Sequence, residues 1–375
     1  MWLLFRHSRL GSFLLIPVIC TSVSGWCSDV NAIVEVLSRP ELFREQGPIQ
    51  SQAEELVSAY APKYWFHSED PGPSDPIQFL ADSSLWLRAP GAVDLKIVER
   101  GKLDPAELPR LWKHPGPARP SDSLNGSGLF LKRESLSISR SPAASDWRGV
   151  PMLWRFGSRV RDDLFLIEYW FHADFSRGGP IGIGNHQGDW EGVAALVGAR
   201  VPQPGVLLHR LVAMYFAAHE GGSWECAQDL EWVSDETGRR RPEAFSALGT
   251  HATYPKPGRN WNPLFLEDAR RGKAWDTWKS LRPLALEPYF GFSGAWGEAN
   301  NWAFMSGPMP PGSFKTMPRE KFRESWVKVI EPMCASKPTW SSLTWEQIPS
   351  PPELPMSGGL AADRPVLPGE PARLP

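Results

Sequence analysis

The chain has 375 residues, and its 40 Lys and Arg against 42 Asp and Glu leave a formal net charge of −2. A near-neutral chain offers no general attraction to nucleic acid or to anionic membranes, so no nucleic-acid partner is expected. Proline (38) and glycine (33) are numerous and interrupt helices, whereas the 19 tryptophans favour strands and fill the space between sheets. Composition therefore predicts a mainly β protein with few long helices.

The first 25 residues are predicted to be a signal peptide. Arg6, His7 and Arg9 precede an apolar run over residues 10–23, and small residues follow as far as Gly25. The run is too short for a comfortable membrane span, so no integral span is expected after cleavage. The protein is therefore predicted to be secreted or extracytoplasmic. An uncleaved N-terminal anchor is the alternative.

Residues 26–60 are predicted to form an N-terminal helical segment. Apolar residues such as Ile33, Val34 and Leu37 recur at helical spacing, and the dipeptide at 61–62, Ala-Pro, should end the second helical stretch. A β domain is expected over 61–335, beginning with a strand around Tyr64. Within it, residues 90–147 are rich in Pro, Ser and Gly and predict an irregular insertion.

Four later stretches are rich in aromatic and branched residues and predict the strands of the core: residues 163–174, 190–197, 206–218 and 242–248. The third is apolar on both faces and is expected to be central. Residues 264–281 are more polar and predict a short helix, while 290–296 and 325–330 are further candidate strands. The proline-rich stretch 349–375 predicts a disordered tail. Together these elements predict a two-sheet β-sandwich with a few peripheral helices and long irregular loops.

The four cysteines are Cys20, Cys27, Cys226 and Cys334. Removal of a signal peptide would leave three, and an exported protein can form one disulfide from them. Cys226–Cys334 and Cys27–Cys334 both remain open. None of the cysteines has zinc-finger spacing, so a structural zinc site of that kind is not expected.

The stretch at 184–192, GNHQGDWEG, concentrates the polar chemistry of the chain. Asp189 and Glu191 are two residues apart, so on a strand both carboxylates project from one face while Trp190 projects from the other. His186 lies in a glycine-flanked turn that can aim its ring back at them. Asp174 ends the preceding strand, and a hairpin-like return would bring it near this group.

Three carboxylates and one imidazole suit a hard divalent cation, with Ca²⁺ or Mg²⁺ favoured over Mn²⁺, and Zn²⁺ less favoured. Asp174, His186, Asp189 and Glu191 are therefore the candidate ligands. The alternative is a solvated strand face, which is how most D-x-E pairs are used. Glu168 and His172 share the strand face of Asp174 and are candidates for a supporting or ligand-facing role.

His219 and His251 are candidate catalytic residues, because each ends a predicted strand, in HEGG and in GTHATY. Strand ends cluster at one edge of aligned sheets, so both rings could border the Asp189 site. There either could act as a general base or fix a phosphate or sugar. The alternative is a histidine hydrogen-bonded to backbone at a strand end.

Several motifs, in order along residues 60–308, resemble the family related to vacuolar protein sorting-associated protein 62. They are YAPKYWFHSED, IEYWFHAD, GNHQGDWEGV, YFAAHEGGSW, RPEAFSALGTHATYPKPG and FGFSGAWGEANNWAFMSGP. The chain departs from the family pattern at Gln187 and Gly192, where Glu and a bulkier residue are common. The resemblance implies a β-sandwich but no securely known activity.

HQGDWE also resembles the heptapeptide GHRHDWE of the necrosis-inducing cytolysins, which are β-sandwiches holding a divalent cation. That resemblance implies the same four ligands, Asp174, His186, Asp189 and Glu191. Gly188 stands where the cytolysins have their second histidine, which puts cytolytic activity in doubt. We therefore expect a secreted metal-binding protein that recognises lipid headgroups or glycans through the cation. The alternatives are a metal-dependent hydrolase of phosphoesters or glycosides and a scaffold with a structural calcium site, so whether it is an enzyme stays open.

Overall fold

The structure is a computed structural model, and it describes residues 30–39, 48–88, 93–111, 128–135, 147, 149–178, 185–203, 206–219, 221–261, 266–292, 294–298, 311, 329–337 and 346–348. The predicted signal peptide, the proline-rich tail and most of the candidate strand at 325–330 lie outside these residues. Among the helices described, none is long and apolar enough to span a membrane.

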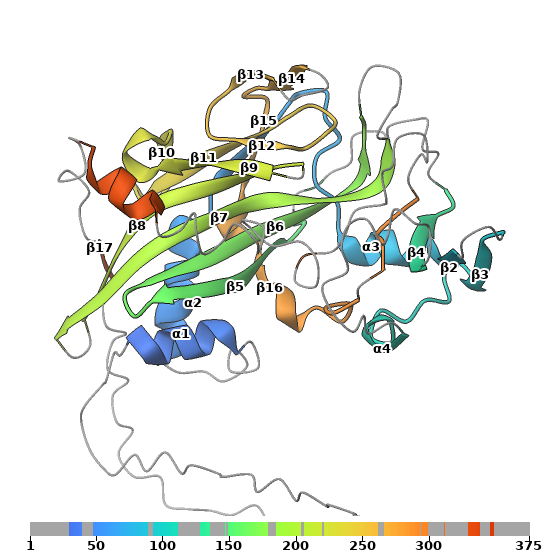
Figure 1. Ribbon diagram of the computed structural model, residues 1–375, viewed down its shortest axis with the longest axis horizontal. Coiled ribbons are helices and arrows are strands. Elements are labelled where there is room, and N and C mark those ends of the chain that lie inside the picture. Colours follow the sequence, from blue (N-terminus) through green and yellow to red (C-terminus); the bar gives the residue numbers. More distant parts are fainter. Residues whose placement is uncertain are drawn as a thin grey trace, which may run out of the picture.

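A seven-stranded sheet forms the centre of the molecule (Figure 1). Its order is β16-β5-β6-β7-β8-β17, with β9 also paired to β8. Long antiparallel ladders join β5 to β8. These strands carry apolar residues on both faces because each face packs against a core. The strands are β5 (Met152–Arg161), β6 (Leu164–Ser176), β7 (His186–Gln203), β8 (Val206–Ala218), β9 (Gly221–Cys226), β16 (Leu281–Pro283) and β17 (Glu346–Ile348).

One face of this sheet packs against a second sheet and two helices, enclosing a first core. The second sheet has the order β10-β11-β1-β15, with β12 paired to β11. Its aromatic side chains, including Tyr64, Phe66 and Trp275, meet Phe171 of β6. These elements are α1 (Val30–Ser38), α2 (Pro48–Tyr60), β1 (Lys63–Phe66), β10 (Trp232–Ser234), β11 (Arg240–Ser246), β12 (Thr253–Tyr254) and β15 (Lys273–Asp276).

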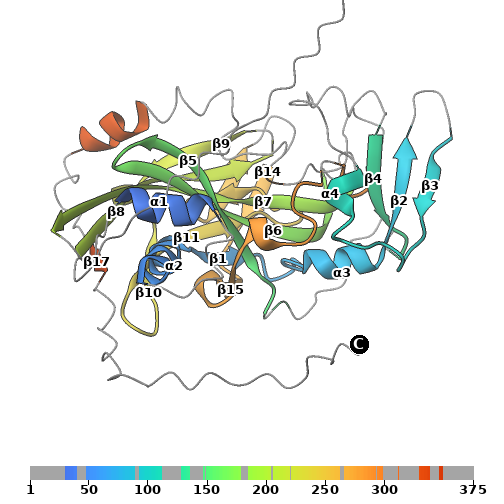
Figure 2. The same ribbon diagram turned by 90° about the horizontal axis from the view of Figure 1, so that it is seen from below.

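The opposite face carries a second core, covered by a small sheet of order β3-β2-β4 and by short helices (Figure 2). Trp170 and Trp190 of the central sheet pack here with Phe79 and Trp296. Trp190 therefore points into the layer opposite its neighbours Asp189 and Glu191, as the sequence predicts. These elements are α3 (Pro76–Ala81), β2 (Ser83–Arg88), β3 (Leu95–Val98), α4 (Leu108–Leu111), β4 (Gly128–Arg133) and η4 (Leu284–Leu286).

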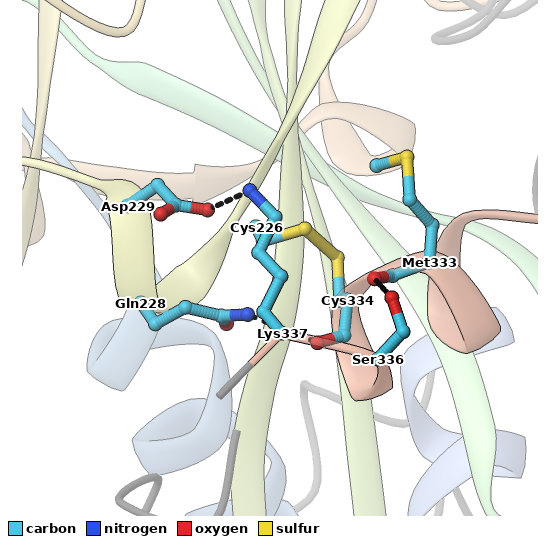
Figure 3. The surroundings of a disulfide bond; sticks show 7 residues. All are labelled: Cys226, Gln228, Asp229, Met333, Cys334, Ser336 and Lys337. Atoms are coloured by element: carbon cyan, nitrogen blue, oxygen red, sulfur yellow. Dashed lines mark hydrogen bonds and ion pairs between the residues drawn. A yellow bond between two sulfur atoms is a disulfide. The ribbon is translucent and has the colours of Figure 1, made fainter. Parts of the chain in front are cut away.

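A disulfide joins Cys226 at the end of β9 to Cys334 in the helical segment 329–335, with Cα atoms 5.5 Å apart (Figure 3). This selects one of the two pairings that the sequence left open. Gln228 donates a hydrogen bond to the Cys334 carbonyl at 3.0 Å, and Lys337 pairs with Asp229 beside it. The bridge thus fixes this segment against the second core.

Three local predictions differ from the structure. Residues 266–281 form strands and one turn of 3-10 helix instead of an α-helix. They comprise β14 (Leu266–Ala269), which pairs with β13 (Gly258–Trp261), then β15 and η3 (Thr277–Lys279). The stretch 90–147 supplies β3, α4 and β4, so it is not wholly irregular. Residues 290–296 form turns with one isolated bridge, Ala295 to Phe130. Tertiary packing decides these short segments, because their own periodicity is weak.

The N-terminal helices and the four core strands form where predicted, and α2 ends at Tyr60, directly before the Ala-Pro dipeptide. The molecule is mainly β with few helices, and its two large sheets pack as in a sandwich. The second core on the outer face of the central sheet adds a further layer. This layering determines which polar side chains of β6 and β7 can meet.

Candidate functional site

The polar motif begins β7 and pairs with the end of β6 in a hairpin. Ala173 lies opposite Asp189, and Phe171 lies opposite Glu191, whereas Ser176 lies opposite His186. Residues opposite each other in a ladder project from the same face. Asp189 and Glu191 therefore point toward the second sheet, and Asp174, which follows Ala173, projects from the other face.

Of the four predicted ligands, Asp174 is thus separated from the carboxylates of β7 by the central sheet. Asp174 forms an ion pair with Arg133 of β4 instead. The Nδ1 atom of His186 donates to the carbonyl of Gly188 at 2.6 Å. The hairpin return occurs as predicted, but its register sends the side chain of Asp174 to the opposite side.

Glu168 and His172 also lie on the face of Asp174 and have structural partners there. Glu168 is buried, pairs with Arg155 at 2.7 Å and accepts from the Trp170 indole at 2.9 Å. His172 contacts Ser74 through Nδ1 at 2.8 Å and is enclosed by aromatic rings. Desolvation lowers the pKa of His172 to about 4, so the ring is neutral at pH 7.

On the inner face, Asp189 belongs to a buried triad. His251 is 0 % exposed, and its Nδ1 lies 3.1 Å from Asp189 Oδ2. Its Nε2 lies 3.5 Å from Oδ1 of Asp70. The Asp70 carboxylate also accepts hydrogen bonds from two backbone N–H groups, that of Gly72 on Oδ1 and that of Gly249 on Oδ2, each at 2.8 Å. One imidazole therefore bridges two carboxylates from distant parts of the chain.

The two carboxylates determine the charge of that imidazole. Burial by itself lowers the pKa of His251, but the charge of Asp70 and the hydrogen bonds to Asp189 and Asp70 outweigh it and raise the pKa to about 10. Burial raises the pKa of Asp70, but His251 more than compensates and lowers it overall. The triad therefore holds one imidazolium between two carboxylates at neutral pH.

A second histidine–carboxylate pair lies beside the triad. His219 Nε2 is 2.8 Å from Glu267 Oε1, and Glu267 also accepts from Thr250 at 2.5 Å and from the Tyr254 hydroxyl. Glu267 is buried, whereas His219 is exposed. This pair presents an imidazole at the surface and anchors it on a buried carboxylate.

Each member of this pair favours the charged form of the other. Burial, the largest effect, raises the pKa of Glu267, yet His219, Thr250 and Tyr254 together lower it overall. Burial likewise lowers the pKa of His219, but the hydrogen bond and the charge of Glu267 outweigh it and raise the pKa above 6.5. The charges of Glu191 and Asp189 make smaller contributions in the same direction. His219 is therefore within electrostatic reach of both β7 carboxylates, as the sequence predicts.

Both histidines have left-handed backbone conformations, with φ of 53° at His219 and 59° at His251. Positive φ is uncommon outside glycine and is often maintained at functional sites. In each case the turn follows a strand and directs the ring back toward β7. Gly249, with φ of 81°, begins the turn that carries His251.

The inner face thus brings together six ionisable side chains from five segments of the chain: Asp70, Asp189, Glu191, His219, His251 and Glu267. Within the part of the chain that the structure describes, no group of three or more His, Cys, Asp or Glu side chains is arranged so that it could hold a metal ion. The four-ligand cation site implied by the cytolysin resemblance stays a prediction. Asp189 and Glu191 place two carboxylates on one face, and a hard cation can take its other ligands from water or from a bound molecule.

Sequence reasoning named four members of this group and missed Asp70 and Glu267. Asp70 is the last residue of the segment YWFHSED, and the resemblance of that segment to a family motif is the signal that points to it. Glu267 lies in the stretch predicted to be helical, and nothing in its local sequence points to His219.

The glycines of the motif have a packing role that explains the residue choice. A Cβ atom at Gly188 would lie 1.9 Å from the Trp296 carbonyl oxygen, and one at Gly192 would lie 1.9 Å from that of Tyr169. Gln187 donates to the carbonyl of Arg133 and accepts from its N–H, both at 2.9 Å. The motif therefore clamps β7 to β4 and to the Trp296 segment, and it holds Asp189 in place.

Comparison with known families gives one match: residues 180–264 match the family model described as vacuolar protein sorting-associated protein 62. The matched stretch contains β7 to β13, including Asp189, Glu191, His219 and His251. Comparison with curated proteins found no match, and comparison with solved structures found none either. Residues 180–264 of this chain are thus similar to the vacuolar protein sorting-associated protein 62 family.

Proposed function

We propose that this chain is a recognition protein that uses a divalent cation, held by Asp189 and Glu191, to bind the oxygen atoms of a lipid headgroup or a glycan. One observation carries the proposal: two buried carboxylates share a face of β7, and two more, Asp70 and Glu267, lie in the same group. With both histidines charged, these six side chains still hold two more negative than positive charges. Burying such an excess is costly, and a bound cation offsets the cost.

Two carboxylates suffice for this chemistry. Mg²⁺ is commonly held by one or two carboxylates and completes its shell with water and substrate oxygens, and Ca²⁺ accepts further oxygen ligands in flexible geometry. Zn²⁺ prefers nitrogen or sulfur ligands, and Mn²⁺ is intermediate. We therefore favour Ca²⁺ or Mg²⁺, with the ligand's phosphate or hydroxyl oxygens completing the shell. The proposal includes export through residues 1–25, which N-terminal sequencing of the mature protein tests.

Calorimetric titration with Ca²⁺, Mg²⁺, Mn²⁺ and Zn²⁺ tests the cation site. We expect Glu191→Gln and Asp189→Asn to weaken binding at least about tenfold. Asp174→Asn is the matched control, because its carboxylate belongs to the four-ligand set but lies on the other face, and it should bind the cation as wild type does. Circular dichroism checks that each variant folds. Unchanged affinity in folded Glu191→Gln would overturn the proposal, and weaker binding in Asp174→Asn as well as in the two β7 variants would support the four-ligand set.

Removal of the cation with a chelator separates a recognition site from a structural calcium site. If the cation serves recognition, a chelator should remove it and leave the fold and the near-ultraviolet spectrum intact. Unfolding on chelation would instead favour a scaffold whose cation stabilises the domain.

A second candidate function is hydrolysis, favoured by the exposed His219 on its buried partner Glu267. Such a pair can transfer a proton to or from a bound phosphoester or glycoside. His251 is fully enclosed and would act only by positioning Asp189. A panel of phosphoester and glycoside substrates tests this: turnover that His219→Gln abolishes would support it, and turnover that the variant retains would exclude His219.

A further inference from the structure

We infer that the β13–β14 hairpin is a membrane-docking element, and that the headgroup bound at the carboxylate site belongs to an anionic lipid in a bilayer. The inference rests on the proposed function for the identity of the ligand. The docking surface itself is argued independently, from exposure, register and charge on the hairpin.

The free end of the hairpin exposes large apolar side chains. Trp261 is 82 % exposed and Leu266 is 42 % exposed, and the two lie directly opposite each other in the last pair of the ladder. Among the residues described, Trp261 is the only aromatic side chain that is exposed. Burial of a tryptophan side chain this exposed would be favourable, and tryptophan is enriched at the membrane interface.

The ladder gives the hairpin two distinct faces. Trp261 and Leu266 share the outward face with the Arg259–Asp268 pair. Glu267 and Ala269 are buried on the inward face, and Glu267 is the partner of His219. One short strand, β14, therefore carries a site residue inward and an exposed apolar residue outward.

The base of the hairpin is anchored to the second sheet, and the apolar pair lies at the other end. The Leu248 N–H donates to the Asp268 carbonyl at 2.9 Å, and Ala247 bridges Ala269. In Figure 1 the hairpin stands at the top edge of the molecule, on the side away from α1 and α2. This arrangement presents the tip without disturbing the core.

The charges on the hairpin favour an anionic surface. Lys256, Arg259 and Arg270 are exposed, and Asp268, which pairs with Arg270 at 2.6 Å, is the acidic residue on the outward face. Each basic side chain near an anionic bilayer strengthens binding by about fivefold, and apolar insertion adds to this. The near-neutral chain as a whole therefore still contains a local patch suited to an anionic lipid surface.

Flotation of the full chain with lipid vesicles tests the inference. We compare vesicles of phosphatidylcholine alone with vesicles that also contain phosphatidylserine, in the presence of Ca²⁺. We expect binding to the mixed vesicles only, weakened by salt, and about tenfold weaker in Trp261→Ser. Leu95→Ser is the matched control, because Leu95 is 61 % exposed on β3 in a different sheet, and it should bind as wild type does.

Equal binding by Trp261→Ser and wild type, or no binding of wild type to either vesicle, would overturn the docking inference. So would equal binding to both vesicles, because the charge argument would then fail. Calorimetry keeps the two proposals distinguishable: Trp261→Ser should retain the cation affinity of wild type. If Glu191→Gln loses the cation yet still floats with vesicles, the hairpin docks and the cation bridge is wrong.

Discussion

At the scale of single residues, the site depends on pairs of opposite charge held out of water. His251 lies between Asp189 and Asp70, and His219 is held on Glu267. The two histidines differ in access, since His251 is enclosed and His219 is exposed. Buried ion pairs do not stabilise a fold by themselves, but removal of one partner leaves an uncompensated charge. His251 therefore fixes Asp189, while His219 is the imidazole that a ligand can reach.

The raised pKa of His251 predicts a specific dependence of stability on pH. The ring binds its proton more tightly in the folded state, with a pKa of about 10 against 6.5 when unfolded. Its contribution is therefore complete below pH 6.5 and is lost as the pH rises toward 10. We expect His251→Gln to lower the free energy of unfolding at pH 6 by about 3–5 kcal/mol. Urea unfolding between pH 6 and 10 should show a smaller deficit at higher pH.

His209→Gln is the control for this experiment. His209 is also buried, but desolvation lowers its pKa to about 4, so its charge does not change between pH 6.5 and 10. The variant should therefore keep the wild-type decline in stability over that range. A deficit in His251→Gln that does not depend on pH would contradict the triad as described.

At the scale of elements, β7 performs two tasks along one strand. Its first residues carry the carboxylates, and its glycines let neighbouring backbone approach closely. Gly188 has φ of 63° and faces the Trp296 carbonyl, while Gly297 faces the backbone of Gln187. This interlocking explains why the motif and the distant WG segment occur together in one chain.

Gly188→Ala should therefore be strongly destabilising. The new Cβ would require both a left-handed alanine and movement of the Trp296 carbonyl, which together cost on the order of 3 kcal/mol. Gly198→Ala on the same strand is the matched control, because its nearest neighbour would lie 3.7 Å away. Thermal unfolding of both variants measures the difference, and similar melting temperatures would refute the interlocking.

At the scale of the whole molecule, the central sheet separates two cores and two sets of polar side chains. The first core lies under the second sheet, and the second core is closed partly by the segment 329–335. The Cys226–Cys334 bridge ties that segment to β9 across 108 residues of chain. The disulfide is thus the covalent link between the C-terminal part of the structure and the central sheet.

Loss of the bridge should destabilise the second core. A native disulfide that closes a long loop typically contributes about 2–5 kcal/mol. We expect Cys334→Ser to lower the melting temperature, and a reducing agent to lower that of wild type by a similar amount while leaving the variant unchanged. Cys27→Ser is the control and should behave as wild type does. A melting temperature that falls in Cys27→Ser as much as in Cys334→Ser would support the Cys27–Cys334 pairing instead.

Local sequence determined much of this structure. Apolar spacing predicted both N-terminal helices and the long strands, and the Ala-Pro dipeptide predicted the end of α2 at Tyr60. Alternation placed Asp189 and Glu191 on one face and Trp190 on the other, because the period of a strand depends only on its own backbone. The strand-end positions of His219 and His251 followed from the same reasoning.

Only the tertiary structure decided which faces meet. The hairpin register sets Ala173 against Asp189, so Asp174 projects away from the carboxylates of β7; a slip of one residue would have moved it to their side. Asp70 reaches the site from the loop after β1 and Glu267 from β14, and no local pattern encodes such long-range pairs. The sequence by itself therefore determined the strands and the candidate residues, while register and sheet packing decided which of those residues share a site.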